Sequence, residues 1–268
     1  MTGRILFVGI ILLCIFFYPK SSHSTMPADF QTYIVGHQLM RYVEITDHEI
    51  KPLIIFIHGS PGGWGAWSRY LNDPDLRQQA HMIAVDRPGY GGSGKGQVER
   101  SLVEQARDIA PLLDKAIPGQ RVLVVGHSFG GPVACRLSMD YGDRITDILI
   151  LAGSIDPDME RTAWYQYPAD WPMFTWMIPT DLLVCNREIR ALKDELIKML
   201  PLWNKIDQRV TVIQGEEDRL VPPENADFAK RVMIKAKDLN IIRLPGMGHF
   251  LPWKRYELVK SQIIKLLK

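Results

Sequence analysis

Residues 121–134, RVLVVGHSFGGPVA, restrict the fold more than any other part of this chain. Aliphatic residues run up to Val125, a single serine then stands among glycines, and a helix-like start follows. A strand that turns this sharply into a helix brings Cβ atoms into collision, and Gly126 and Gly130 have none. Ser128 would then project from the start of a helix, where backbone N–H groups converge. The pattern predicts a nucleophile elbow; the alternative is a glycine-rich turn with an inert serine.

The rest of the chain alternates short apolar runs with longer amphipathic stretches, which predicts βαβ units. Uninterrupted apolar runs such as LIIFI are typical of parallel strands buried on both faces. We therefore expect an α/β fold: a mostly parallel, eight-stranded, doubly wound sheet flanked by helices, with the first two strands as an antiparallel hairpin. The expected strands are residues 32–35, 40–45, 53–57, 82–85, 122–125, 145–151, 210–214 and 240–244. The expected helices are residues 64–70, 102–116, 129–141, 223–235 and 256–267.

The regular alternation stops between residues 154 and 207. This segment is rich in Trp, Tyr, Met and Pro, and then becomes a charged helical stretch over residues 186–200. Prolines at 168, 172 and 179 exclude one long helix through the aromatic part. We predict a small helical insertion that acts as a lid over an apolar pocket, the alternative being plain structural packing. Its candidate pocket residues are Trp164, Tyr167, Trp171, Phe174 and Trp176.

The N-terminus differs from the rest of the chain. Arg4 precedes an uncharged apolar run over residues 5–18. As a helix this run would span about 21 Å, which is shorter than the hydrocarbon core of about 30 Å. This length favours a secretory signal peptide, with Ser22 and Ser24 as the small residues before a cleavage site at Thr25.

Two alternatives to cleavage remain open for this segment: an uncleaved membrane anchor and a buried helix of the domain. We expect residues 1–24 to be the signal peptide or anchor and residues 30–268 to form the folded domain. With a cleaved signal peptide, the domain is exported to the periplasm or secreted. With an uncleaved anchor, the N-terminal segment holds the domain at the membrane. In both cases the domain lies outside the cytoplasm.

Composition excludes several classes of function. The formal net charge is +2 over 268 residues, and no long basic run is present, so nucleic acid is not expected as a partner. No cysteine lies in a C-x-x-C pattern or near histidine at zinc spacing, so no metal site is predicted. No organic cofactor is implied either, and the oligomeric state is left open.

A nucleophilic serine needs a base, and the base needs an acid to orient it. In a chain with this type of elbow the expected order is Ser, acid, His. His249 is the only histidine after His127, and His127 is excluded because adjacent side chains at an elbow point apart. The favoured acid is Asp218, which closes the loop after the strand VTVIQG. Asp156, which follows another strand end, is the alternative.

An acyl-transfer site also needs N–H donors for the oxyanion. One donor is expected to be the backbone N–H of Phe129, directly after the serine, and the other that of Ser60 in the loop HGSPGG. The alternative is a glycine-rich turn without function. We expect His58 to hold this loop by hydrogen bonds rather than to take part in chemistry.

The segments HGSPGG, DRPGYGGS, GHSFGG, GEEDRLVP and GMGHF resemble the α/β-hydrolase fold superfamily in order and spacing, over nearly the whole chain from about residue 30. These motifs are specific for the fold and for a serine-based triad, but not for a substrate. The resemblance also favours a structural role for Asp86, in ordering loops. It implies a catalytic set made of Ser128, Asp218, His249 and the backbone N–H groups of Ser60 and Phe129.

The nucleophile and its neighbour separate the branches of this superfamily. Dehalogenases and epoxide hydrolases place aspartate at the elbow, which Ser128 disfavours. Proline iminopeptidases have a similar H-G-x-P-G loop but usually tryptophan after the serine, where this chain has Phe129. We expect an esterase or lipase-like serine hydrolase acting through an acyl-enzyme on small-molecule apolar ester or acyl substrates. Aminopeptidase activity, other acyl transfer, perhydrolysis, carbon–carbon bond hydrolysis and non-catalytic ligand binding remain alternatives.

Overall fold

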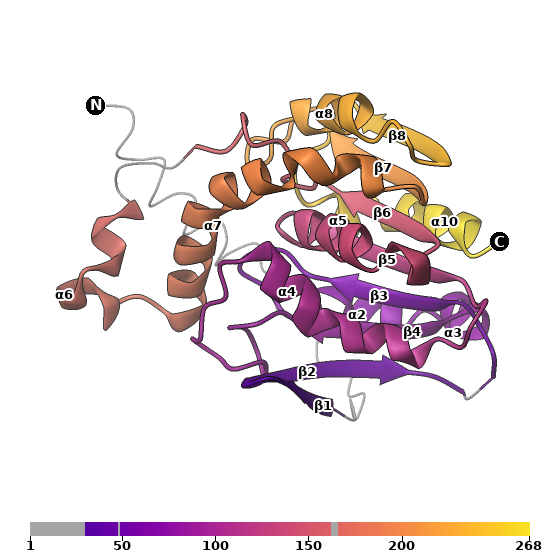
Figure 1. Ribbon diagram of the computed structural model, residues 1–268, viewed down its shortest axis with the longest axis horizontal. Helices are drawn as coiled ribbons and strands as arrows, with labels where there is room; N and C mark the ends of the chain where they lie inside the picture. Colours follow the sequence, from indigo (N-terminus) through magenta and orange to yellow (C-terminus); the bar gives the residue numbers. More distant parts are fainter. Residues whose placement is uncertain (1–29, 48, 162–165) are drawn as a thin grey trace.

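The computed structural model describes residues 30–47, 49–161 and 166–268 (Figure 1). The predicted signal peptide or anchor and the pocket candidate Trp164 therefore lie outside the described residues. Within these ranges, no helix has both the length and the apolar character that crossing a bilayer requires.

Eight strands form one sheet in the order β1-β2-β4-β3-β5-β6-β7-β8 (Figure 1). Antiparallel pairing joins β1 to β2 and β2 to β4, and all other neighbours are parallel. The predicted fold class and the predicted hairpin are thus confirmed. The strands are β1 (Phe30–Val35), β2 (Gln38–Ile45), β3 (Leu53–Ile57), β4 (His81–Asp86), β5 (Val122–His127), β6 (Asp147–Leu151), β7 (Arg209–Gly215) and β8 (Asp238–Leu244).

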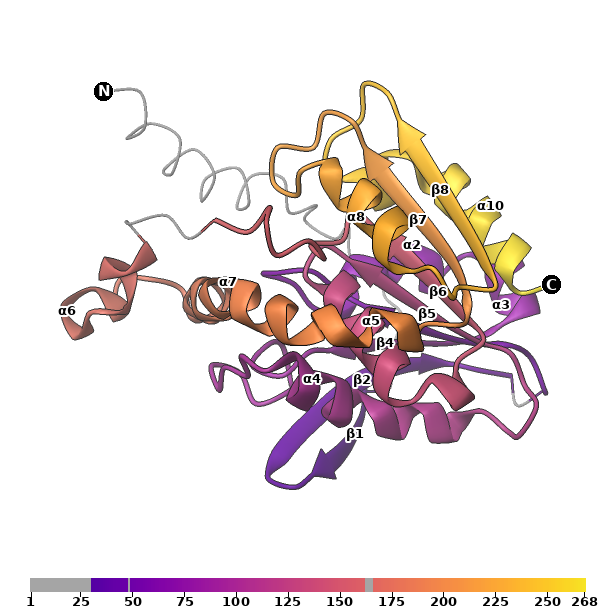
Figure 2. The ribbon, with the colours of Figure 1, turned by 45° about the horizontal axis from the view of Figure 1, so that its top comes forward.

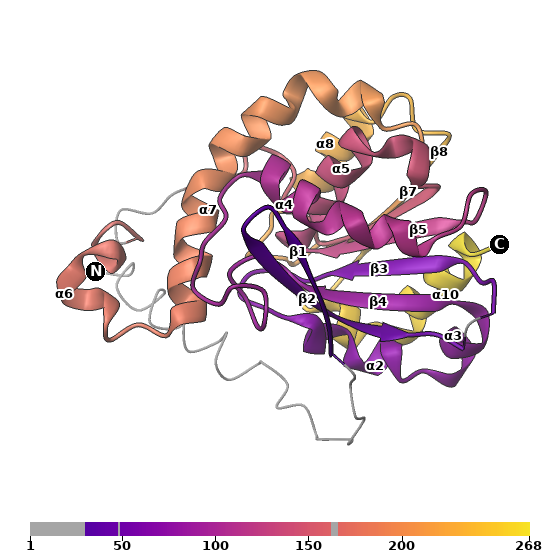
Figure 3. The same ribbon diagram turned by 60° about the horizontal axis from the view of Figure 1, so that its bottom comes forward.

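Helices cover both faces of the sheet, and successive strand residues alternate between the two resulting cores. In β5, Val124 faces the core under α4 and α5, whereas Val125 faces the core under α2, α3 and α10. Figure 3 shows α4 and α5 on one side of the strands and α2 and α3 on the other. The principal helices are α2 (Ser68–Leu71), α3 (Pro74–Gln79), α4 (Leu102–Ile109), α5 (Gly130–Asp140), α8 (Glu224–Val232), α9 (Leu251–Lys254) and α10 (Tyr256–Leu266).

Two expected helices differ from the observed ones. The first, over residues 64–70, is a 3₁₀ turn, η1 (Trp64–Trp67), followed by α2. The second ends as an α-helix at Ile109 and continues as the 3₁₀ helix η2 (Ala110–Lys115), because Pro111 lacks the N–H that would continue the α-helical bonds.

Helix α3 was not predicted, although its start carries a recognisable signal. Asp73 caps it by accepting hydrogen bonds from the backbone N–H groups of Asp75 and Leu76, and Pro74 occupies the first helical position.

The segment between β6 and β7 contains η5 (Pro168–Asp170), α6 (Pro172–Thr175), α7 (Thr180–Met199) and η6 (Leu200–Lys205). Helix α7 begins directly after Pro179 and so starts six residues earlier than predicted. It runs along the edge of the molecule, and α6 stands away from the sheet beyond the start of α7 (Figures 2 and 3). The role of residues 154–207 as a lid stays a prediction.

Candidate active site

The predicted site residues follow strands whose carboxyl ends meet at one edge of the sheet. From β3 the chain goes to β4 on one side and, after α4, to β5 on the other, so the strand order reverses there. In open α/β sheets ligands bind at such a switch point, beside the carboxyl ends of the strands. The two loops touch: a Cβ atom on Gly59, after β3, would lie 2.9 Å from the Cβ of Ser128, after β5.

Ser128 has a backbone conformation that few non-glycine residues adopt. Its φ of 54° lies in the left-handed region. Neighbouring backbone holds it there: its N–H donates to the carbonyl of Leu151 at 3.0 Å, and its carbonyl accepts from Gly131 at 2.9 Å and from Ser154 at 3.3 Å. A strained residue that is fixed on both sides is typical of a functional site.

The two elbow glycines are required by close backbone contacts. A Cβ atom on Gly126 would overlap the carbonyl oxygen of Gly130, one turn further on. A Cβ atom on Gly130 would overlap the carbonyl oxygen of Ile57 at the end of β3. Helix α5 can therefore lie this close to β5 only because Gly126 lacks a side chain, and this close to β3 only because Gly130 lacks one.

Asp218 and His249 meet after β7 and β8, at the same edge of the sheet. The Nδ1 of His249 lies 2.8 Å from Oδ2 of Asp218, and both side chains are buried. A carboxylate only accepts hydrogen bonds, so Nδ1 carries a proton, and the neutral form of this ring has its lone pair on Nε2. The other carboxylate oxygen accepts the backbone N–H groups of Leu220 and Val221, each at 2.9 Å, which fixes the carboxylate plane.

Asp156, the alternative acid, is engaged elsewhere. Its backbone N–H and that of Ile155 donate to Oδ1 of Asn225 at 2.8 and 2.7 Å. Its own carboxylate accepts the N–H of Asp158 at 2.9 Å and lies 3.6 Å from the guanidinium of Arg231. The structure thus pairs His249 with Asp218, and uses Asp156 to shape the loop after β6.

His127 has a contact that the sequence did not reveal. Its Nε2 lies 3.2 Å from the carbonyl oxygen of His249, and the centroid of its ring lies 4.8 Å from that of His249 and 5.1 Å from that of Trp253. Burial, together with the nearby His249, holds the pKa of His127 well below its usual value. The neutral ring donates from Nε2 and so ties the β5 elbow to the loop that carries His249.

His58 holds the loop after β3 by hydrogen bonds, as expected. Its Nε2 accepts the backbone N–H of Arg87 at 2.9 Å, so its Nδ1 donates to the carbonyl of Gly59 at 2.7 Å. Burial, and secondly the charge of Arg87, hold the pKa of His58 well below its usual value, which keeps it neutral. The hydroxyl of Ser60 lies 2.8 Å from that of Tyr90.

Phe129, the other predicted oxyanion donor, is the buried residue that precedes α5. Its backbone N–H follows Ser128 directly at the start of this helix, where the first N–H groups have no partner within the helix. Its ring packs against the guanidinium of Arg87 at 4.6 Å.

Asp86 orders loops, as expected. Its Oδ1 accepts the backbone N–H of Trp64 at 2.8 Å. Its Oδ2 accepts that of Gly92 at 3.0 Å and also binds the guanidinium of Arg41, whose Nε lies 2.7 Å away. The buried carboxylate therefore joins η1, the turn after β4 and strand β2.

Four of the predicted pocket residues of the insertion lie within the described part of the chain, and Trp164 lies outside it. Tyr167, Trp171 and Trp176 are 52%, 54% and 80% exposed, and Phe174 lies on α6. Helix α6 itself stands away from the sheet (Figure 2). Their part in binding a substrate stays a prediction.

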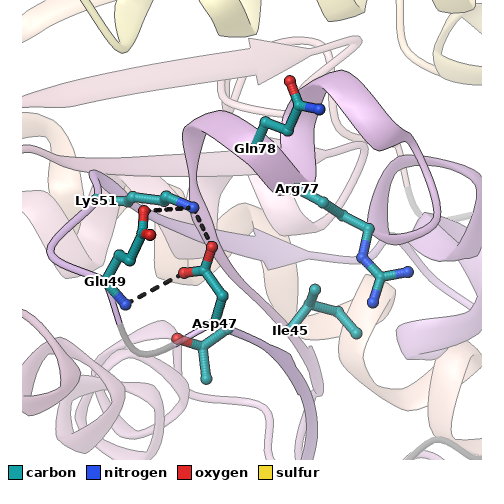
Figure 4. Close-up of a pocket in the computed structure, with 7 residues that line it drawn as sticks. Ile45, Asp47, Glu49, Lys51, Arg77 and Gln78 are labelled. Carbon is teal, nitrogen blue, oxygen red and sulfur yellow. Dashed lines mark hydrogen bonds and ion pairs between the residues drawn. The ribbon is translucent and has the colours of Figure 1, made fainter.

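One surface hollow, of about 500 Å³, lies at the opposite edge of the sheet (Figure 4). It is lined by Ile45, Thr46, Asp47, Glu49, Lys51, Arg77 and Gln78. Lys51 pairs with Asp47 and with Glu49, so these charges satisfy one another. Among the residues that the structure describes, no three His, Cys, Asp or Glu side chains gather in a way that could hold a metal ion.

The elbow, the Asp–His pair and the sheet are typical of an alpha/beta hydrolase, and comparison with known proteins supports this class. Residues 54–260 match the model of the alpha/beta hydrolase family, and the chain belongs to that family. A dihydrolipoyllysine-residue acetyltransferase component of the acetoin cleaving system of Pseudomonas putida is 24% identical over 87% of this chain and 68% of its own.

Two further comparisons show how far the likeness extends. Epoxide hydrolase 1 of Caenorhabditis elegans is 31% identical over 50% of this chain, which spans only 34% of that protein. The structure of Est816, described as an N-acyl homoserine lactone degrading enzyme, superposes with a TM-score of 0.64. That match covers 88% of this chain and 99% of Est816. Because the sequence identity is only 19%, the match supports the fold alone.

Proposed function

We propose that this alpha/beta hydrolase is a serine hydrolase that cleaves carboxylic esters through an acyl-enzyme. One observation carries the proposal: the buried Nδ1–H of His249 binds Asp218 at 2.8 Å, at the sheet edge where the strained elbow presents Ser128. A histidine oriented in this way has a free Nε2, which is the atom that a general base needs.

In the proposed reaction, Oγ of Ser128 attacks the ester carbonyl carbon while its proton passes to Nε2 of His249. The carboxylate of Asp218 stabilises the imidazolium that forms. His249 then returns the proton to the leaving alcohol as the carbon–oxygen bond breaks, which leaves the acyl group on Ser128. Water, deprotonated by His249, attacks the acyl-enzyme and releases the carboxylic acid and the free serine.

The negative charge on the carbonyl oxygen needs donors that are already in place. We assign this role to the backbone N–H groups of Phe129 and Ser60. The first belongs to the residue after the nucleophile, at the start of α5. The second belongs to the loop that packs against the elbow through Gly59.

The residue at the elbow argues against epoxide hydrolysis, despite the partial match to an epoxide hydrolase. The epoxide hydrolases of this superfamily use aspartate at that position, whereas this chain has Ser128.

We also propose roles for two further segments of the chain. Residues 154–207 would form a lid that favours apolar acyl groups, and residues 1–24 would direct export or anchor the chain to a membrane. The intact mass of the protein recovered from cells separates cleavage before Thr25 from retention of the segment.

The test of the proposed function is hydrolysis of p-nitrophenyl acetate, butyrate, octanoate and laurate. We expect Ser128→Ala to lower kcat by about 10⁴-fold or more. Ser138→Ala is the matched control, because its hydroxyl is buried in α5 and donates only to the carbonyl of Ala134. Wild-type protein that is folded yet hydrolyses none of the four esters would overturn the proposal.

A further inference from the structure

The guanidinium of Arg87 is fully buried and uses all five of its N–H donors. Two bind carbonyl oxygens of the loop after β3: Nε donates to His58 at 2.9 Å and Nη2 to Gly59 at 3.0 Å. Two bind the carboxylate of Glu188 at 2.8 and 2.9 Å, and the fifth donates to the side-chain oxygen of Gln105 at 2.9 Å. These hydrogen bonds fix the loop after β3, the guanidinium of Arg87 and the carboxylate of Glu188 relative to one another.

Glu188 comes from α7, in the segment between β6 and β7, and its side chain is fully buried. It accepts a third strong hydrogen bond, from the hydroxyl of Tyr90 at 2.6 Å. Because that hydroxyl has one proton, it accepts from the hydroxyl of Ser60, 2.8 Å away. Glu188 thus reaches Ser60 by two routes, one through Arg87 and Gly59 and one through Tyr90.

The carbonyl of Gly59 determines where the N–H of Ser60 points. The peptide bond between these residues is trans, so its C=O and N–H lie on opposite sides. The carbonyl accepts from Nη2 of Arg87 and from Nδ1 of His58, which directs the N–H of Ser60 away from Arg87. The same loop packs against Ser128 through Gly59.

We propose that Arg87 and Glu188 are positioning residues for the oxyanion hole, through which helix α7 holds the N–H of Ser60 in place. This inference rests on the proposed function. Neither side chain touches the reacting atoms; the pair acts through the carbonyl of Gly59. The segment predicted to form the lid therefore also contributes, through its one buried glutamate at this site, to the geometry of catalysis.

Two substitutions test the pair from both sides. Glu188→Gln removes the charge and one acceptor from Arg87, so the guanidinium and the carbonyls it binds can shift. Arg87→Lys keeps the charge but loses the planar fork that binds two carbonyls and a carboxylate together. We expect each to lower kcat for p-nitrophenyl acetate by about 10- to 100-fold, part of the effect of losing an oxyanion donor outright, with KM within about threefold.

Glu195→Gln is the matched control. Glu195 is a second buried glutamate on α7, but it accepts the backbone N–H of Leu102 at 2.9 Å and pairs with Lys198 at 2.5 Å. A general loss of stability in α7 would affect both glutamine variants, whereas loss of oxyanion geometry affects only Glu188→Gln. We expect Glu195→Gln to retain the wild-type kcat within about twofold.

A second readout isolates the oxyanion. An aryl trifluoromethyl ketone forms a tetrahedral adduct with a nucleophilic serine, and this adduct carries the negative oxygen. Its inhibition constant should rise in Glu188→Gln and Arg87→Lys in proportion to the loss of kcat/KM, and should stay unchanged in Glu195→Gln. If Glu188→Gln does not fold, the double variant Arg87→Met/Glu188→Leu, which leaves no buried charge unpaired, takes its place and should fold with a similarly low kcat.

Wild-type kcat in folded Glu188→Gln and Arg87→Lys would overturn the inference, as would an equal fall in Glu195→Gln. Failure of the proposed function is distinguishable from this outcome. In that case the wild-type protein itself neither hydrolyses the ester nor binds the ketone, and the proposed roles of Arg87 and Glu188 fall with it.

Discussion

The carboxyl edge of the sheet and the outer part of the insertion differ in how firmly their residues are held. At the edge, Asp218 and His249 are buried and hydrogen-bonded, and Ser128 keeps a strained φ because neighbouring backbone fixes it on both sides. In the insertion, Trp171 and Trp176 are more than half exposed. Segments with few buried contacts open most easily, whereas functional groups need over-determined positions.

Helix α7 belongs to both regions. Arg187 and Arg190 pair with Asp170 of η5 at the outer side, while Glu188 lies buried against Arg87. The insertion therefore contains both kinds of region. Its outer part has exposed side chains, whereas α7 is part of the framework that holds the site.

Among the substitutions that test this comparison, the largest effect, a loss of kcat, is expected at the Asp–His pair. Asp218→Asn keeps the size of the side chain but presents an amide to Nδ1 of His249, which favours the wrong tautomer. We expect kcat to fall by about 10⁴-fold, with the melting temperature little changed. Steady-state ester hydrolysis measures it, and Asp158→Asn, on an exposed loop residue, is the control. A loss below tenfold would mean that the pair does not act in catalysis.

The next effect concerns the fold at the elbow. Gly126→Ala would set a methyl group against the backbone of Gly130, which cannot move without shifting α5. We expect a loss of about 1–3 kcal/mol in the free energy of unfolding, measured by urea denaturation. Gly65→Ala is the control, since a Cβ there meets nothing within 4 Å. Equal stabilities of the two variants would show that the elbow is not closely packed.

A smaller effect is expected from pH. Burial holds the pKa values of His58 and His127 well below the usual value of 6.5, so the folded protein resists protonation that the unfolded chain accepts. Stability contributed by these neutral rings is present above pH 6.5 and is lost as the pH falls below it, by at most about 1.4 kcal/mol per pH unit for each histidine. Urea denaturation from pH 7.5 to 5 should show this slope, and it should become shallower in His127→Gln. If the pH dependence of the free energy of unfolding is unchanged in His127→Gln, groups other than His127 take up the protons.

The smallest effect is expected in the outer insertion. Trp176 is 80% exposed, so Trp176→Ala should change the free energy of unfolding by less than about 0.5 kcal/mol. If the segment acts as a lid, the same variant should alter the preference among acetate, octanoate and laurate esters. A large loss of stability would contradict the division between the two regions, and an unchanged preference would contradict the lid.

The central strands were predictable because strands buried on both faces are continuous apolar runs. All eight expected strands lie near the observed bounds. The start of α7 was missed because its first turn lies directly after Pro179, within a segment whose prolines indicated breaks. The residues around the elbow could be predicted because the local steric demand for glycine is visible in the sequence.

The choice between Asp218 and Asp156 was not decided by sequence, because both follow a strand end; only the folded loops show which one meets His249. The pairing of Arg87 with Glu188 joins residues 101 positions apart, and the contact of His127 with His249 joins residues 122 apart. No local pattern marks such contacts, because they depend on how β4, β5, α7 and the last loop pack together.

The most direct test of the central claim is covalent labelling with a fluorophosphonate. The folded wild-type protein, Ser128→Ala and His249→Ala would each be treated, and the adduct located by intact mass and peptide mapping. We predict one adduct on Ser128 in the wild type and none in either variant. A folded wild-type protein without an adduct, or with the adduct on another residue, would contradict the claim that Ser128 is a nucleophile activated by His249.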